Sequence, residues 1–297
     1  MPKSVIDKFL TYLRYERNRS EQTVERYEMS LRDFEAFFQS LDAGLDWASV
    51  DADIIRRWME SLMDRGNIAS TVNTDLSALR SFYRFALARK LVSRDPAHNL
   101  TGPKKQKPLP QFMREDEMDR LLDSEEWEDD YINVRARTIL IFLYEAGLRR
   151  GELTGLNDRD VDFEASQLKV TGKRSKQRIV PFGQELAEQL RHYMEVRDKE
   201  AGIREEDALF VDKHGKRMTG SQVYHVVRTN LSRVTTMKKR SPHVLRHSFA
   251  TAMLNHDAGL ESVRQLLGHE SLETTEVYTH TTFEQLKRVY KHAHPRG

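Results

Sequence analysis

The sequence contains no cysteine and no long uninterrupted run of apolar residues. The absence of cysteine excludes disulfides, thiolate-bound zinc or iron–sulfur clusters, and a cysteine nucleophile. No stretch approaches the ~18 apolar residues that a transmembrane helix needs. The first residues lack the apolar segment of a secretory signal. We therefore expect a cytoplasmic protein that contacts no membrane.

The net charge is small, but the charges are unevenly distributed along the chain. At 297 residues, the length suggests about two domains, and a net charge of +2 does not by itself indicate a nucleic-acid partner. Residues 213–256, however, contain no aspartate or glutamate and carry nine lysines and arginines. Such a stretch favours a surface that faces a polyanion over a merely solvated basic face. Acidic residues collect in 115–130, where we expect an outward face without chemistry.

The first hundred residues predict a helical domain. Apolar residues recur at helical spacing in four segments, which are 5–13, 23–38, 54–62 and 72–87. Asp51 and Ser70 are expected to cap the third and fourth helices, and Gly66 to end the third.

Residues 101–112 predict a stiff, extended linker, because they combine three prolines with Gly102 and three lysines. Lys104, Lys105 and Lys107 are candidates for contacts with a phosphate backbone. A solvated connector explains the composition equally well.

The second domain, 113–297, has a mixed pattern. A helix over 131–146 is expected to end at Gly147, and further helices follow at 150–156, 184–199, 221–234, 242–256, 260–267 and after Thr282. Short strands are expected at 160–163, 167–170 and 178–181. The fold class is therefore mainly α with a small β-sheet in the second domain.

Four local patterns in this domain carry candidate chemistry. They are Gly147-Leu148-Arg149-Arg150-Gly151-Glu152, Lys173 at a hairpin tip, His243-Val244-Leu245-Arg246, and Leu266-Leu267-Gly268-His269 followed by Tyr278. Two arginines can hold the non-bridging oxygens of a phosphodiester. A tyrosine can attack phosphorus with help from a histidine, and a lysine can protonate the leaving oxygen. Each pattern alone is weak, whereas the ordered set indicates phosphoryl transfer.

On these motifs the sequence resembles the tyrosine recombinases, and most closely the Xer-type recombinases that resolve chromosome dimers. The resemblance covers nearly the whole chain. It implies a C-shaped clamp of two domains around DNA, with a core-binding, SAM-like helical domain (1–100), the basic linker (101–112) and a catalytic domain (113–297) that ends in a docking helix.

The resemblance also implies a role for each site residue. Arg149 and Arg246 would clamp the phosphate, with Glu152 supporting Arg149. Lys173 would protonate the leaving 5′ oxygen, with Lys176 as the alternative because Arg174 departs from the family pattern. The remaining roles would fall to His243 for the proton of the nucleophile, His269 for the scissile phosphate and Tyr278 as nucleophile. The basic residues Lys238, Lys239 and Arg240 are further candidates for DNA contacts.

Four protomers on two DNA sites are implied, with no metal or other cofactor. The sequence leaves open whether the four protomers are identical or include a paralogous recombinase, and whether a septal DNA translocase is a further partner. The last helix, with Phe283, Leu286, Val289 and Tyr290 on one stripe, is expected to dock into a neighbouring protomer. Integration of a mobile element is the alternative role.

Three other classes of protein share parts of this pattern. A metal-dependent nuclease would use Asp158, Asp160 and Asp162, which would share one face of a strand; otherwise they are expected to be solvated. The sequence does not form a calcium loop, because Phe163 takes the glycine position. A DNA-binding regulator would leave Tyr278 unexplained. A type IB topoisomerase shares the chemistry but would relax DNA as a monomer.

Overall fold

The computed structural model describes residues 4–105, 111–172, 176–200, 204, 207–268 and 280–296, with the backbone alone for 280–285. The chain divides into two compact units, Met1–Pro108 and Leu109–Gly297. No helix among the described residues is long and apolar enough to cross a membrane.

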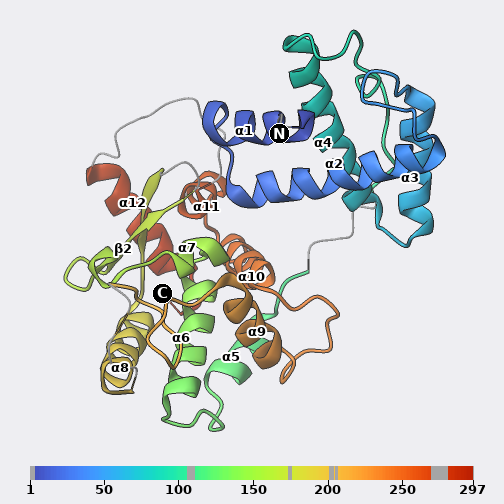
Figure 1. Ribbon diagram of the computed structural model, residues 1–297. Helices are drawn as coiled ribbons and strands as arrows, with labels where there is room; N and C mark the ends of the chain where they lie inside the picture. Colours follow the sequence, from blue (N-terminus) through green and yellow to red (C-terminus); the bar gives the residue numbers. More distant parts are fainter. Residues whose placement is uncertain are drawn as a thin grey trace. The chain divides into compact units, whose positions relative to one another are not determined.

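The first unit is helical (Figure 1). Its helices are α1 (Val5–Thr11), which continues into a π-helical segment (Tyr12–Glu16), α2 (Glu21–Leu41), α3 (Ala52–Asp64) and α4 (Ala69–Ala88). Large aromatic side chains fill the centre of this unit, where Phe34 packs against Trp47 and Trp58, and Trp47 against Phe82. Burial of such side chains is the main stabilising contribution to a small helical unit.

The predicted caps of α3 and α4 differ in outcome. The Asp51 side chain accepts a hydrogen bond from the backbone N–H of Ile54 at 2.9 Å, which confirms it as the cap of α3. Gly66, at φ +83°, follows the end of that helix. The prediction for Ser70 is wrong, because α4 begins at Ala69 after Ile68, and no side chain caps it.

After Ala88 the chain packs back onto α4 before it leaves the first unit. Arg80 donates to the backbone oxygens of Ala97 and Leu100. Asn73 Nδ2 donates to the backbone oxygen of Pro103 at 2.8 Å. The first residues of the predicted linker are therefore held against the helical unit.

The second unit surrounds one buried helix, α6 (Tyr131–Glu145). The other elements are α5 (Glu115–Leu122), α7 (Arg150–Thr154), β1 (Val161–Asp162), β2 (Gln167–Thr171), β3 (Gln177–Pro181), α8 (Gln184–Glu200), α9 (Gly220–Leu231), α10 (Pro242–Asn255), α11 (Leu260–Leu267) and α12 (His280–Ala293). Helices α5, α7, α8, α9 and α10 all pack against α6 (Figure 1). The unit is mainly helical, as the sequence predicted.

The three strands form one antiparallel sheet in the order β1-β2-β3. In the register of β2 and β3, Val170 lies opposite Arg178 and Thr171 opposite Gln177. The backbone N–H of Gly172 donates to the backbone oxygen of Lys176 at 2.7 Å and closes the hairpin. The sheet therefore places Arg178 two residues after Lys176, opposite Val170.

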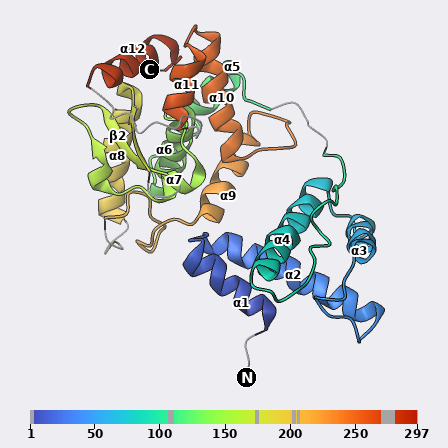
Figure 2. The same ribbon diagram turned by 90° about the horizontal axis from the view of Figure 1, so that it is seen from above.

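The C-terminal helix α12 packs within its own subunit. Leu286, Tyr290 and Ala293 are buried in one cluster with Phe249 and Leu266. Figure 2 shows α10, α11 and α12 lying together. Leu286 and Tyr290 of the predicted stripe are therefore covered by α10 and α11 of the same chain, and Val289 is partly buried against them. The side chain of Phe283 lies outside the described residues, and docking into a neighbouring protomer stays a prediction.

Candidate active site

A tight turn between α6 and α7 places the first arginine of the site. Gly147 adopts φ +58°, and a Cβ at this position would lie 2.6 Å from the Phe249 ring. Only glycine combines that backbone conformation with so close a neighbour. Two residues later, Arg149 precedes the first turn of α7, with its side chain 39% exposed.

Glu152, buried in α7, binds Arg149 in two ways. One carboxylate oxygen accepts the backbone N–H of Arg149 at 2.9 Å, and the other accepts Arg149 Nη1 at 2.7 Å. The backbone bond closes a capping arrangement at the start of α7. The predicted support of Arg149 by Glu152 thus has a direct geometric basis.

The second arginine, Arg246, comes from α10 and is buried. Its Nη1 donates to the backbone oxygen of Gly147 at 2.6 Å and lies 3.9 Å from Glu152 Oε2. Burial is the main cause that lowers the pKa of Arg246 to about 10, and the positive charge of Arg149 is the next. The guanidinium group is therefore still charged at neutral pH.

Three arginines meet at the C-terminal turn of α11. Three successive backbone oxygens accept hydrogen bonds: Leu266 from Arg178 Nε at 3.0 Å, Leu267 from Arg246 Nη2 at 2.6 Å, and Gly268 from Arg149 Nη2 at 3.2 Å. The last carbonyls of a helix have no partners within the helix and carry partial negative charge. The arginines satisfy them and fix this turn, which directly precedes His269.

Arg178 is the residue of this cluster that the sequence analysis missed. It extends from β3 and forms two hydrogen bonds, both 2.9 Å long, to the two oxygens of Glu152. The signal was present in the sequence, because side chains alternate between the faces of a strand. Arg178 therefore shares a face with the apolar Val180, where a buried charge requires a partner.

His243 lies on α10 one turn before Arg246, as predicted. The pKa of His243 is lowered from its usual value mainly by partial desolvation, and to a smaller extent by the nearby positive charges of His247 and Arg246. A lowered pKa increases the neutral fraction at pH 7, and only the neutral imidazole can accept a proton. The histidine is therefore suited to act as a general base.

Three of the predicted catalytic residues, Lys173, His269 and Tyr278, lie outside the described residues. The linker residue Lys107 does so too. Lys104 and Lys105 are exposed in the first unit. Lys238 and Lys239 are exposed in the segment between α9 and α10, and Arg240 beside them is half-buried.

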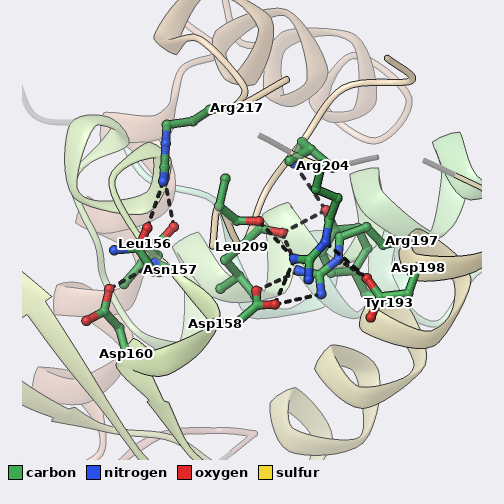
Figure 3. Close-up of polar contacts among 12 residues, drawn as sticks. Leu156, Asn157, Asp158, Asp160, Tyr193, Arg197, Asp198, Arg204, Leu209 and Arg217 are labelled. Atoms are coloured by element: carbon green, nitrogen blue, oxygen red, sulfur yellow. Dashed lines mark hydrogen bonds and ion pairs between the residues drawn. The ribbon is translucent and has the colours of Figure 1, made fainter. Parts of the chain in front are cut away.

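The aspartates considered as metal ligands do not converge. Asp158 and Asp160 lie in a 3-10 helix and not on a strand. Asp158 binds Arg197 and Arg204, whereas Asp160 accepts the backbone N–H of Asn157 (Figure 3). Asp162 accepts the backbone N–H of Ala165. Two expectations are therefore wrong: the three carboxylates do not share one strand face, and Asp158 is paired with arginines. No group of three potential metal ligands occurs among the described residues.

The described part of the site carries more positive than negative charge, because three guanidinium groups share the single carboxylate of Glu152. Phosphoryl transfer adds negative charge to the non-bridging oxygens in the transition state. Preorganised cationic donors stabilise that charge. The geometry is therefore suited to binding and activating a phosphodiester.

Two family patterns match the chain. The phage integrase family matches residues 111–285, and the N-terminal SAM-like domain of phage integrases matches residues 6–90.

Curated relatives match nearly the full length. The tyrosine recombinase XerC of Chlorobaculum tepidum is 37% identical, over 98% of this chain and 94% of that protein. The tyrosine recombinase XerD of Oceanobacillus iheyensis is 35% identical, over the whole of both chains.

Solved structures share the fold. A XerH site-specific recombinase bound to palindromic difH DNA gives a TM-score of 0.70 at 22% identity, over 95% of this chain and 83% of that chain. The Tn1549 transposon integrase bound to transposon right end DNA gives 0.71 at 18% identity, over 96% and 99%.

Proposed function

This chain belongs to the phage integrase family, the tyrosine recombinases, and we propose that it resolves chromosome dimers by recombining two copies of one DNA site in the cytoplasm. As a member of this family, it is a tyrosine-type site-specific recombinase that breaks and rejoins DNA. The proposal extends this activity to a biological role and to individual residues.

The convergence of Arg149 and Arg246 is the observation that carries the assignment of residues. The two side chains come from different elements, yet both donate to consecutive carbonyls of one turn and both face Glu152. Their remaining N–H groups can take the two non-bridging oxygens of the scissile phosphate.

In the proposed reaction the Tyr278 oxygen attacks phosphorus while His243 takes the phenolic proton. The bond from phosphorus to the 5′ oxygen breaks, and Lys173 supplies the proton that makes this oxygen a hydroxyl group. His269 holds the phosphate. The product is a 3′-phosphotyrosyl ester, which conserves the energy of the broken bond, so that religation needs no high-energy cofactor.

Recombination needs four such reactions on two sites. We propose a tetramer of protomers, each formed by two domains that clamp the duplex. One pair of strands is exchanged first and gives a Holliday junction, and the second pair follows. A paralogous recombinase and a septal DNA translocase are the proposed partners.

Similarity to XerC and XerD proteins favours dimer resolution over integration of a mobile element. Their identity of 35–37% extends over 98–100% of this chain. The transposon integrase, at 18% identity, shares the fold alone.

Genome-wide mapping of the DNA fragments bound by the chain tests this role. We expect a single bound locus near the replication terminus. Binding at the ends of a mobile element, with none near the terminus, would contradict dimer resolution but would leave the recombinase chemistry intact.

A further inference from the structure

Arg178 makes more polar contacts within the site than a salt bridge needs. Its two terminal nitrogens bind both oxygens of Glu152, and its Nε binds the backbone oxygen of Leu266. Its side chain is 8% exposed, so these bonds are shielded from water. One residue of the sheet therefore holds both α7 and the end of α11.

The turn at Gly268 is shaped around this side chain. Gly268 adopts φ +63°, and a Cβ there would lie 3.0 Å from Arg178 Cδ and 3.2 Å from its Nε. A larger residue would thus be strained by its backbone and crowded by Arg178. The contact fixes the backbone immediately before His269.

We propose that Arg178 is a positioning residue of the phosphate clamp, which holds the Glu152 carboxylate and the α11 turn so that Arg149 and Arg246 meet the scissile phosphate in a fixed geometry. The inference rests on the proposed roles of those two arginines. Arg178 has all three of its donor nitrogens engaged within the protein and acts through Glu152 and the turn.

The electrostatics of Glu152 support this role. Burial of Glu152 opposes its ionisation and by itself would raise its pKa. The hydrogen bonds and charge of Arg178 outweigh burial and, together with smaller contributions from the hydrogen bonds of Arg149, lower the pKa to about 2. Among the described residues, the other groups that face it are Arg246 from α10 and the backbone of Gly172 at the end of β2. Removing Arg178 leaves burial opposed by fewer positive charges, so the pKa of Glu152 rises.

A pH profile separates positioning from simple structural support. The substrate is a nicked suicide duplex that carries the site recovered by genomic mapping, and the initial rate of covalent adduct formation is followed from about pH 5 to about pH 9. With Arg178→Met, we expect nearly unchanged DNA affinity. We expect a rate reduced by up to about 100-fold at low pH, the loss that a misplacement of about 1 Å of positioned groups can cause. The rate should partly recover as pH rises and Glu152 ionises.

The double variant Arg178→Met/Glu152→Gln should be slow without this recovery, because it has no carboxylate to ionise. Arg197→Met is the matched control. Arg197 is a buried arginine of the same unit that binds both oxygens of Asp158 and the backbone oxygen of Leu209 (Figure 3) and takes no part in the hydrogen bonds of the clamp. Its loss should lower stability and leave the shape of the wild-type pH profile unchanged.

A wild-type rate and profile in Arg178→Met, or the same change of profile in Arg197→Met, would overturn the inference. If Arg178→Met does not fold, Arg178→Lys decides in the same assay. Lysine keeps the charge but cannot bind both oxygens and Leu266 together, so a smaller change of the same kind is expected, and an unchanged profile refutes the role. If the wild-type chain forms no adduct at all, the proposed function fails instead.

Discussion

Arg149 donates through Nη2 to the backbone oxygen of Gly268, which lies 119 positions later in the chain, at 3.2 Å. The opposite nitrogen, Nη1, binds Glu152 at 2.7 Å. Arg149, which directly precedes α7, therefore links that helix to the turn that leads into His269. Parts of the site that are distant in sequence are connected through this one side chain.

The first prediction concerns the stability that Glu152 contributes. Its pKa is about 2 in the folded chain against an ordinary value of 4.5, so the stabilisation is present above pH 4.5 and is lost as pH falls towards 2. A shift of this size corresponds to about 3 kcal/mol. Glu152→Gln should lower the free energy of unfolding by roughly that amount at pH 7, measured by urea denaturation. The difference should close as the pH falls from 4.5 towards 2, and a difference independent of pH would contradict it.

The second prediction concerns His294, which directly follows α12. His294 is buried between the rings of Phe249 and Tyr290, and burial lowers its pKa to about 4. Below pH 6.5 the unfolded chain binds a proton that the folded chain excludes, so stability falls between pH 6.5 and 4, by about 3 kcal/mol. His294→Phe should remove this part of the acid sensitivity in melting curves recorded across that range. His225→Phe, on the exposed face of α9, is the control and should retain the acid sensitivity of the wild-type chain.

The third prediction concerns metal. Recombination should persist in excess chelator, because arginine, lysine and histidine provide the charge stabilisation that metal ions provide in many nucleases. Gel analysis of recombined products with and without EDTA measures this. Loss of cleavage with EDTA and its return with magnesium would contradict the expectation.

The fourth prediction assigns the general acid. Lys173→Ala should slow cleavage of ordinary DNA strongly, since general acid catalysis typically contributes about 10²–10⁴-fold. A substrate with sulfur in place of the bridging 5′ oxygen leaves as a thiolate and needs little protonation. The same variant should then cleave it at nearly the wild-type rate, as followed by gel quantification of cleaved strands.

Arg246→Ala is the control for this experiment and should show no rescue, because its proposed contacts are to non-bridging oxygens. If sulfur rescued Lys176→Ala and not Lys173→Ala, the general acid would be Lys176.

Local signals predicted the elements well and their long-range contacts poorly. Asp51 caps α3 as expected because its hydrogen bond to Ile54 spans only three residues. Helix α6 ends just before Gly147, as expected, because glycine has no Cβ and readily adopts the left-handed backbone conformation that this turn requires. Ser70 is not a cap, since α4 already begins at Ala69, after Ile68, without any side-chain cap.

The candidate site shows the same limit. The residue types and order of Arg149, His243 and Arg246 made them candidates from the sequence alone. The role proposed for Arg178 depends instead on its contact with Glu152, 26 positions away. The surface against which α12 packs could not be predicted from the sequence either. Its apolar stripe predicts that it is covered, and the identity of the covering surface, α10 and α11, is set only by the folded chain.

The most direct test of the account is the covalent intermediate on Tyr278. The wild-type chain, incubated with the nicked suicide duplex, should form an adduct that survives denaturant and is linked to the 3′ side of the break. Tyr278→Phe should abolish this adduct and leave DNA binding nearly intact, because a single hydroxyl group is lost from a large, mainly electrostatic interface. An undiminished adduct in the phenylalanine variant, detected by denaturing gel electrophoresis, would place the nucleophile elsewhere and contradict the proposed mechanism.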